Sequence, residues 1–406
     1  MTSERLLTLS PYRCFPPQSG GGRRIYHLNR GLARAGFEVE LIAGSYLRRA
    51  ERPWARPYRE TISPGLVEQR YANPVLMALN IVLRRAELPE VGVSLLPDLA
   101  VPAPRLTRAL ADHRLVMLEH PYWFDRIADR LRSRHVLVLD AHNIESLLFP
   151  RLSDGSALDR QLLRRLEALE GRAMRAASAI FFCSESDRQQ ACEMFGLLPE
   201  RTHLAPNGVD TNEVAFVTPE QRLQAKHALG FKGGAVGLFV GTDWPPNVEA
   251  VRALVEIARA LPEVTFAVVG SVGRSFAPIG LPNFVMPGVV ETLEPWLAAA
   301  DVAVNPMISG SGSNLKLFEY LAAGLPVVST KFGARGLDVA NSKAIVAAPI
   351  ENFPEAVRAL LAAPDLPARR ETARRLALRY DWDAIAGRMA ETLRSISAQG
   401  GSGSSV

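Results

Sequence analysis

The stretch "GSGSNLKLFEYLAAGLPVVST" (310–330) is the part of the sequence from which the fold can be worked out. Apolar residues recur in its middle at helical spacing, and they are Leu315, Phe318, Leu321 and Ala322. This spacing predicts a short helix with one buried face. Gly324 favours the end of that helix, and Pro326 cannot continue it. The two valines that follow are typical of a buried strand, so the helix leads into the interior of a sheet.

The start of this predicted helix is suited to an anion. Gly310 and Gly312 let the backbone turn tightly just before the helix, whose first amide groups have no partner within it. Lys316 adds a positive charge in the first turn, and Glu319 follows one turn deeper. The alternative is a Gly/Ser loop without a function, in which Lys316 and Glu319 form a solvated surface pair. The neighbouring segments have to decide between these two interpretations.

Strands and helices alternate on both sides of this stretch. Nearly continuous apolar runs predict strands at 5–9, 37–43, 114–118, 135–139 and 179–183, and again at 236–241, 264–270, 301–306, 326–330 and 344–348. Helical spacing predicts helices at 23–35 and 247–260. Such alternation indicates parallel sheets covered by helices on both faces. Two series in 406 residues predict an α/β protein with two doubly wound domains.

Composition and charge exclude several other classes of protein. The chain is 48% hydrophobic and 22% charged, which is the balance of a globular protein. It has no run of about 18 apolar residues and no signal-peptide pattern, and its three cysteines lack metal-binding spacing. We therefore expect a cytoplasmic protein with no metal and no spanning helix. The net charge of +5 is too small to indicate nucleic-acid binding.

Basic residues cluster in the first half of the chain. They are Arg23, Arg24, Arg48, Arg49, Arg52, Arg84 and Arg85. We expect such clusters to be solvated surface in most cases. The functional alternative is that these residues contact an anionic substrate or an anionic membrane surface. Contact with a membrane would make the protein peripheral at the inner face of the plasma membrane.

Glycine-rich segments follow several predicted strands. They are 16–22, 241–247, 270–275 and the loop at 309–314. Because open parallel sheets bind ligands at the carboxyl ends of their strands, these loops converge on the places where a ligand is expected. Their recurrence favours the phosphate interpretation of the 310–330 stretch.

With these segments assembled, the chain resembles a family 4 (group 1) glycosyltransferase of the GT-B fold. The resemblance spans nearly the whole chain, and the segments that carry it are 20–43, 180–187, 204–210, 239–250 and 309–337. It implies two Rossmann-like domains facing across a cleft. The expected acceptor-binding domain covers 1–205 and the nucleotide-sugar-binding domain covers 206–380. A closing helix at 381–396 returns to the first domain, and 397–406 form a disordered tail.

The resemblance also implies which residues bind the donor. They are Gly21, Gly22, Gly241, Thr242, Asp243, Gly270, Val290, Ser311, Gly312, Ser313, Asn314, Leu315, Lys316 and Glu319. In this interpretation Lys316 and the first helical amides stabilise the leaving diphosphate, so no metal is needed. Glu319 accepts hydrogen bonds from the ribose hydroxyls.

The chain departs from the family pattern at one position. The family has a Glu followed eight positions later by a second Glu, and here Glu319 matches the second while Ser311 takes the place of the first. The sequence therefore resembles a branch with the motif Gly-Ser-Gly-x-x-Leu-Lys-x-x-Glu. The usual Arg and Lys after the first strand of the second domain are also missing, which leaves Lys316 as the main cation at the diphosphate.

Two histidines follow predicted strands of the first half. His120 takes the place where the family often has a histidine near the transferred sugar, and His142 follows the next strand near Asp140 and Glu145. Either imidazole could bind a sugar hydroxyl or move an acceptor proton. We therefore expect His120, Lys316 and Glu319 to be catalytic and both histidines to contact the acceptor.

The resulting hypothesis is a metal-independent, retaining hexosyltransferase without a cofactor. It would move a sugar from a nucleotide-diphosphate sugar to a glycan, lipid-linked or small-molecule hydroxyl in polysaccharide, glycolipid or other glycoconjugate synthesis. Two alternatives stay open: a GT-B-like epimerase or hydrolase of sugar nucleotides, and a catalytically silent scaffold that binds them. Release of nucleotide diphosphate with and without acceptor separates the three.

Overall fold

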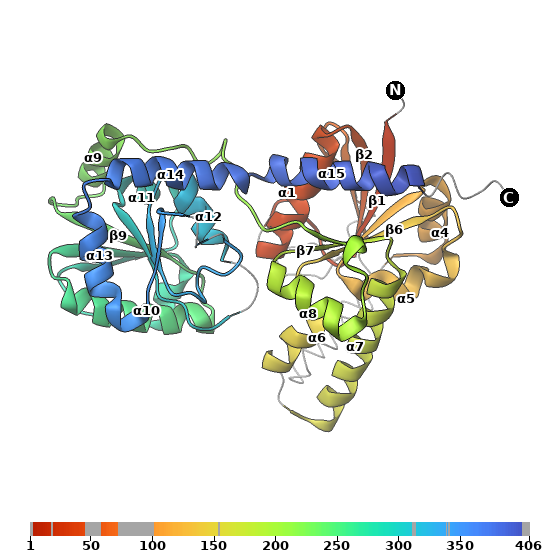
Figure 1. Cartoon of the computed structure of the whole chain (residues 1–406), viewed down its shortest axis with the longest axis horizontal. Coiled ribbons are helices and arrows are strands. Elements are labelled where there is room, and N and C mark those ends of the chain that lie inside the picture. Colours follow the sequence, from red (N-terminus) through yellow and green to blue (C-terminus); the bar gives the residue numbers. More distant parts are fainter. Residues whose placement is uncertain are drawn as a thin grey trace. The chain divides into compact units, whose positions relative to one another are not determined.

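The computed structural model describes residues 3–17, 19–44, 58–71, 101–152, 155–310, 314–337, 339 and 342–399. The chain divides into two compact units (Figure 1). The first unit comprises Met1–Pro206 together with Trp382–Val406, and the second comprises Asn207–Asp381. The prediction of two α/β domains is confirmed by the two sheets described below.

The first unit is built on an eight-stranded sheet. Its strands are β1 (Glu4–Ser10), β2 (Phe37–Gly44), β3 (Tyr58–Ser63), β4 (Leu66–Tyr71), β5 (Leu115–Glu119), β6 (Val136–Ala141), β7 (Ala179–Phe182) and β8 (Thr202–Leu204). They lie in the order β3-β4-β2-β1-β5-β6-β7-β8, and every pair is parallel except β3 with β4. Strands β5 and β6 are buried along their whole length, as their apolar runs predict.

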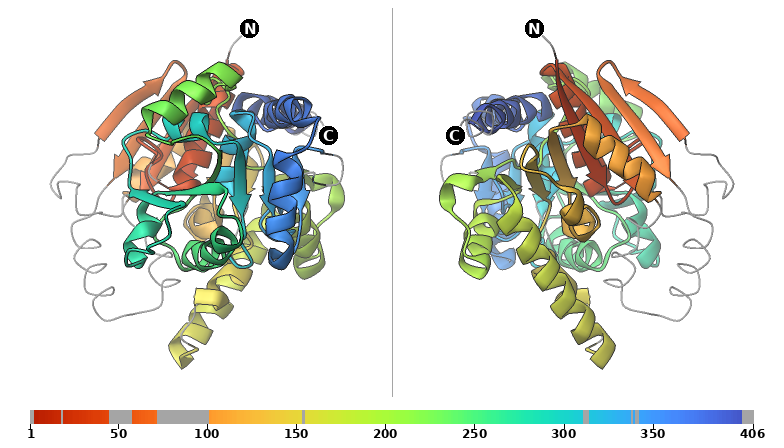
Figure 2. Two further views of the ribbon diagram at one scale, coloured as in Figure 1. Left: turned by 90° about the vertical axis from the view of Figure 1, so that its left-hand side faces the viewer. Right: turned by 90° about the vertical axis from the view of Figure 1, so that its right-hand side faces the viewer.

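Helices cover the sheet of the first unit. They are α1 (Gly20–Arg34), α4 (Ala103–Asp112), α5 (Phe124–Ile127), α6 (Glu145–Leu148), α7 (Ala157–Ala176), α8 (Glu185–Phe195) and α15 (Trp382–Gln399). Figure 2 shows α7, in yellow-green, extending below the sheet of this unit. The short α6 packs against α7, which matters for the site described below.

The C-terminal helix α15 packs on α1 of the same unit. The imidazole of His27 stacks on the indole of Trp382, with ring centroids 5.5 Å apart. Arg34 of α1 also forms an exposed ion pair with Asp383 of α15 at 2.6 Å. These contacts join the last helix to the first, although more than 340 positions of sequence separate Arg34 from Asp383.

The second unit is built on a six-stranded parallel sheet. Its strands are β9 (Ala235–Val240), β10 (Val264–Val269), β11 (Phe284–Gly288), β12 (Val302–Asn305), β13 (Val327–Ser329) and β14 (Ile345–Ala347), in the order β11-β10-β9-β12-β13-β14. Its helices are α9 (Pro219–Ala228), α10 (Pro245–Ala260), α11 (Glu294–Ala299), α12 (Leu315–Ala322), α13 (Phe353–Leu361) and α14 (Leu366–Arg379). Helix α12 is the short helix predicted within 310–330, and its apolar face, including Phe318 and Leu321, is buried in the core.

Most element positions follow the sequence pattern to within a few residues. The clearest difference is α1, which begins at Gly20 and not near Arg23, because Ser19 caps it by accepting a hydrogen bond from the amide of Gly22. The segment 20–22 is therefore the first turn of a helix and not a loop. The sequence patterns also missed the strands β3, β4, β8 and β11, which are short or mixed in polarity.

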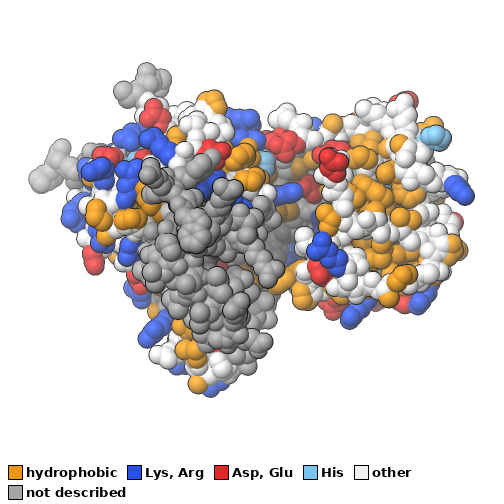
Figure 3. Space-filling model, turned by 180° about the vertical axis from the view of Figure 1, so that it is seen from behind, with side chains coloured by type: hydrophobic (Ala, Val, Ile, Leu, Met, Phe, Trp, Pro, Cys, Tyr) orange, Lys and Arg blue, Asp and Glu red, His pale blue; other side chains and the backbone are white. Residues whose placement is uncertain are grey.

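The surface bears on the membrane prediction. Within the described ranges, no helix is long and apolar enough to cross a bilayer. Figure 3 shows Lys and Arg side chains interspersed with acidic ones on the visible face of the molecule. Arg24 is 1% exposed, so the prediction of a solvated or lipid-binding role is wrong for that residue. The clusters at Arg48, Arg49, Arg52, Arg84 and Arg85 lie outside the described residues.

Candidate functional site

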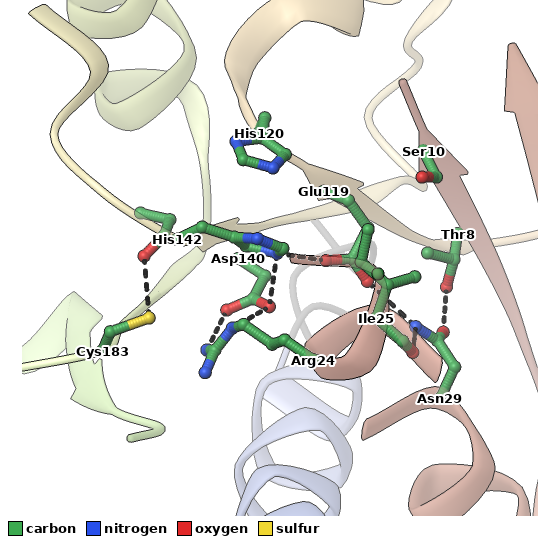
Figure 4. A network of polar contacts seen from close by, with 12 residues as sticks. Thr8, Ser10, Arg24, Ile25, Asn29, Glu119, His120, Asp140, His142 and Cys183 are labelled. Atoms are coloured by element: carbon green, nitrogen blue, oxygen red, sulfur yellow. Dashed lines mark hydrogen bonds and ion pairs between the residues drawn. The ribbon is translucent and has the colours of Figure 1, made fainter. Parts of the chain in front are cut away.

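Polar side chains of the first unit gather at the carboxyl ends of β1, β5 and β6. The strand order reverses between β1 and β5, because the chain runs outward from β1 through β2 and then returns to place β5 on the other side of β1. Ligands of open α/β sheets bind at such switch points. Glu119 ends β5, His120 follows it, and Asp140 lies opposite Glu119 in the parallel register of β6 (Figure 4).

A buried ion pair anchors this cluster. Arg24 on α1 binds Asp140 with two hydrogen bonds, from Nε at 2.9 Å and from Nη2 at 2.5 Å, and neither side chain is more than 1% exposed. Burial opposes ionisation of Asp140, but the Arg24 guanidinium and the hydrogen bonds hold the pKa of this carboxyl well below its usual range. The pair therefore stays charged inside the protein.

His142 completes the charge balance of the cluster. Its Nε2 donates to Glu119 at 2.9 Å and lies 3.4 Å from Asp140. Burial alone would lower the pKa of His142, but the two carboxylates outweigh it and raise the pKa above the ordinary value. Asn29 donates a second hydrogen bond to Glu119 and accepts one from Thr8, which extends the network onto β1.

The pKa of His120 is shifted in the opposite direction to that of His142. Burial, reinforced by the nearby His142, lowers the pKa of His120. Its Nδ1 lies 2.7 Å from Glu145 Oε1, and a carboxylate can only accept, so Nδ1 carries the proton. Its Nε2 is then an acceptor, and it lies 3.0 Å from the hydroxyl of Tyr12. His120 thus directs its unprotonated nitrogen at the hydroxyl of Tyr12.

The backbone of His120 is strained. Its φ of 69° makes it the one residue other than glycine with positive φ in the described part of the chain. Such a conformation is uncommon for a side chain with a Cβ atom, and it persists where the surroundings fix it. Here Glu145 and Tyr12 hold the two ring nitrogens, and the amide of His120 donates to the carbonyl of Asp140 at 3.2 Å. Strain of this kind often marks a functional residue.

Gly21 of α1 lies beside Tyr12 and His142. A Cβ atom at this position would lie 2.1 Å from the hydroxyl of Tyr12 and 3.6 Å from Nδ1 of His142. A side chain at this position would therefore displace the Tyr12 hydroxyl, which lies 3.0 Å from Nε2 of His120. The structure brings Gly21, His120 and His142 together, whereas Gly22 packs against its own cap at Ser19.

Three of these side chains have the right atoms for a metal ion. Ligand atoms of Glu119, Asp140 and His142 all lie within 4.8 Å of one another. Both oxygens of Asp140, however, accept hydrogen bonds from Arg24, and Nε2 of His142 donates to Glu119. A cation among them would also lie next to the Arg24 guanidinium. The donor set fits an internal network of ion pairs and does not fit a metal site.

The second unit has its own switch point, between β9 and β12. Lys316, at the start of α12 beyond β12, donates from Nζ to Asn247 Oδ1 at 2.9 Å, and Asn247 lies on α10 beyond β9. The ammonium also lies 4.0 Å from the centroid of the Phe239 ring and 3.5 Å from the sulfur of Met307. Burial lowers the pKa of Lys316 to about 7, against a smaller upward effect of Glu319.

These contacts bear on the surface-pair interpretation of Lys316. Its partners are an amide oxygen, an aromatic ring and a thioether, and within the described residues no carboxylate forms an ion pair with it. Glu319 lies one turn later in α12 and is half-buried. A partly buried cation with no ion-pair partner in the described part of the chain is suited to bind an anion.

The loops after β9 and β10 lie against each other. The carbonyl of Gly241 accepts from the amide of Val272, and a Cβ atom at Gly270 would lie 2.2 Å from that same carbonyl oxygen. Gly270 also has a φ of 112°, so its place between the two loops requires glycine. Asp243 accepts from Ser275 at 2.5 Å, and its amide donates to Ser271. Asp243 is not the helix cap, because Trp244 holds that position at the start of α10.

The remaining predicted donor-binding residues lie in different surroundings from one another. Asn314 is the N-cap residue of α12. Its side chain donates to the carbonyl of Gly333 at 2.6 Å and accepts no hydrogen bond from the first amides of α12. Thr242 contacts Asn247, Leu315 packs on the core, and Val290 lies partly buried after β11. The predicted residues Ser311, Gly312 and Ser313 lie outside the described residues.

Several residues of the two clusters, the one around His120 and the one around Lys316, were not identified from the sequence. They are Tyr12, Arg24, Asn29, Glu119, Glu170 and Asn247. Glu119 carried a usable signal, because it is a charged residue at the carboxyl end of an apolar strand. Tyr12, Asn29 and Asn247 had no such signal, since their partners are distant in the sequence.

Two family models match the chain. Residues 18–213 match the model described as Glycosyltransferase Family 4, and residues 234–363 match the model for Glycosyl transferases group 1. Together the two models match most of the chain, and they place it among glycosyltransferases of the group 1, family 4 type.

Curated relatives match part of the chain. Glycogen synthase of Mycobacterium tuberculosis is 27% identical over 241 residues, which are 55% of this chain and 56% of that protein. The chain therefore spans about half the length of the curated relatives it matches.

Solved structures share the fold along nearly the whole chain. HepE of Anabaena in complex with UDP has a TM-score of 0.65 at 16% identity, covering 96% of this chain and 100% of that one. WaaG, a glycosyltransferase involved in lipopolysaccharide biosynthesis, has a TM-score of 0.63 at 19% identity, covering 95% and 99%. The trehalose 6-phosphate synthase of Burkholderia multivorans has a TM-score of 0.65 at 14% identity, covering 98% and 99%. These similarities establish the GT-B fold.

Proposed function

We propose that the chain is a retaining hexosyltransferase that moves a sugar from a nucleotide-diphosphate donor to a hydroxyl acceptor, without a metal or a cofactor. The bond between the anomeric carbon and the diphosphate oxygen breaks, a bond to the acceptor oxygen forms, and the acceptor hydroxyl loses its proton. The products belong to polysaccharide, glycolipid or other glycoconjugate synthesis. The family matches support the reaction class.

The observation that carries the proposal is the environment of Lys316. Its ammonium is desolvated at the start of a helix, beside a strand switch point, with uncharged partners. A diphosphate supplies the missing anion, and the charge that develops on the leaving group strengthens this contact in the transition state. Glu319, one turn deeper, can accept hydrogen bonds from two ribose hydroxyls.

The first unit supplies the groups for the acceptor in this proposal. His120 is neutral with Nε2 as a hydrogen-bond acceptor, so it can bind or deprotonate a hydroxyl. His142, with its raised pKa, favours the charged form and suits a hydroxyl oxygen or an anionic group of the acceptor. The two histidines therefore offer an acceptor and a donor of hydrogen bonds side by side.

A panel of donors tests the reaction. The complexes of HepE with UDP and with UDP-glucose make UDP-glucose the first donor to try, followed by GDP-, ADP- and dTDP-sugars. Release of nucleotide diphosphate that depends on an added acceptor supports the transferase. Equal release without any acceptor indicates a hydrolase, and tight binding with no turnover of any donor indicates a silent scaffold. The anomeric configuration of the product, read by NMR, tests retention.

Binding to an anionic membrane surface is a separate part of the proposal. It depends on the basic clusters of the first half, and Arg24 no longer belongs among them. Co-sedimentation with neutral and with anionic vesicles at low salt tests it. Equal sedimentation with both kinds of vesicle contradicts this part and leaves the transferase proposal intact.

A further inference from the structure

Glu170 is a buried carboxylate that the proposed reaction does not use. It lies on α7, is 0% exposed, and points at the first turn of the short helix α6. Its Oε1 accepts from the amide of Glu145 at 2.7 Å, and its Oε2 accepts from the amide of Ser146 at 3.0 Å and from the Ser146 hydroxyl at 2.6 Å. In the described residues, α6 has no side-chain cap of its own, so Glu170 provides the cap from another helix.

The residue fixed by this cap is the partner of His120. Glu145 uses Oε1 to hold Nδ1 of His120 at 2.7 Å and Oε2 to accept from the hydroxyl of Tyr122 at 2.9 Å. Because α6 has only four residues, its own backbone hydrogen bonds cannot hold it rigidly. The orientation of His120 therefore depends on a chain of contacts that begins at Glu170.

We propose that Glu170 is a positioning residue, which holds Glu145 so that the His120 imidazole keeps its proton on Nδ1 and presents Nε2 as a base. The proposal rests on the proposed function, since it names Glu170 as the residue that controls the His120 imidazole at the acceptor. Glu170 itself does not touch the substrate, and it acts through the backbone of Glu145.

A purely structural role for Glu170 is the alternative. In that case its loss would lower stability and leave the titration of His120 unchanged. The chemistry of Glu170 is unusual for a structural cap, because burial raises its pKa to about 7. Glu145 adds to this rise, so the charge of one carboxylate acts on the other.

The test follows the imidazole of His120 by NMR in the full chain, with its resonance assigned from a His120→Gln variant. The variants are Glu170→Gln, which keeps the shape but can no longer accept from all three donors, and Glu145→Gln, which removes the direct partner. Glu167→Gln is the matched control, because Glu167 is an exposed glutamate on the same helix. Glu145 raises the pKa of His120, so Glu170→Gln should lower that pKa in the same direction as Glu145→Gln, while Glu167→Gln leaves it unchanged.

An unchanged His120 titration in Glu170→Gln, with a shift in Glu145→Gln, overturns the proposal. If Glu170→Gln does not fold, Ser146→Ala carries the test, since it removes one of the three hydrogen bonds and should give a smaller shift of the same sign. The titration can be read whether or not the protein transfers sugar, so its failure is distinct from failure of the proposed function. With a working donor, Glu170→Gln should lower kcat by roughly tenfold to a hundredfold and leave the donor KM unchanged.

Discussion

The imidazoles of His120 and His142 lie with their ring centroids 4.0 Å apart, and their pKa values are shifted in opposite directions. Burial lowers the pKa of both rings, and the difference between them comes from the carboxylates that each ring contacts. Nε2 of His142 lies close to both Glu119 and Asp140. His120 contacts Glu145, and the positive charge of His142 lowers its pKa further. Two adjacent groups with separated pKa values can serve as a base and as a hydrogen-bond donor at one pH.

This relationship predicts the order in which the two histidines titrate. In an NMR titration of the folded protein, His142 should keep its proton to a higher pH than His120. Glu119→Gln should lower the pKa of His142, because the charge that favours the imidazolium is lost. A protein in which His120 is the last of the pair to lose its proton would contradict the arrangement of charges.

Replacing Lys316 should weaken donor binding and slow transfer together. Lys316→Met keeps the apolar contact with Phe239 and removes the charge. A charge-assisted hydrogen bond contributes about 1.5–3 kcal/mol, which corresponds to roughly a ten- to hundredfold loss of affinity for the donor. Calorimetry with UDP-glucose and steady-state kinetics measure the two effects. Lys331→Met is the control, since Lys331 is exposed in the same unit, and wild-type affinity in Lys316→Met would rule out a diphosphate contact.

Donor binding should depend on pH through Lys316. Its pKa of about 7 in the free protein means that the ammonium begins to lose its proton near neutrality. An anion beside it favours the charged form, so binding takes up a proton and affinity falls as the pH rises through 7 and above. Calorimetry in buffers of different ionisation enthalpy measures the proton uptake. The dependence should vanish in Lys316→Met; if the variant keeps it, another group is responsible.

Breaking the buried ion pair should cost far more stability than breaking an exposed one. Asp140→Asn leaves the Arg24 guanidinium buried without its counter-ion, and we expect a loss of about 3–5 kcal/mol in the free energy of unfolding. Asp125→Asn is the matched control, because Asp125 pairs with Arg172 at 2.7 Å with both side chains about half exposed. Its loss should stay below about 1 kcal/mol. Urea denaturation measures both, and similar losses would mean that burial does not set the strength of these pairs.

Chelators should leave sugar transfer unchanged. The three side chains with metal-ligand spacing are Glu119, Asp140 and His142, and Arg24 already occupies both oxygens of Asp140. In the proposed reaction, Lys316 supplies the charge that a metal would otherwise bring to the diphosphate. Turnover is measured with and without EDTA after dialysis. Activity that disappears in EDTA and returns with magnesium or manganese would refute metal independence.

The fold class and the loops where ligands are expected could be predicted from the amino-acid sequence. Apolar runs and helical spacing are local properties, so they indicated the strands, the helix within 310–330 and the two-domain α/β organisation. Lys316 was also recognisable, because its place after a glycine-rich turn and at a helix start is written in consecutive residues. The histidines could be placed at strand ends for the same reason.

How these residues combine could be read only from the folded chain. Arg24 and Asp140 are 116 positions apart and Tyr12 and His120 are 108 apart, and they meet because the strand order places β5 and β6 beside β1. That order depends on long-range packing, which no local pattern encodes. Burial then set the charges: it made Arg24 an interior ion-pair partner where the sequence indicated surface, and it lowered the pKa values of His120 and Lys316. Desolvation is a property of the folded core, so the chemistry of the site follows from the packing and not from the residue types alone.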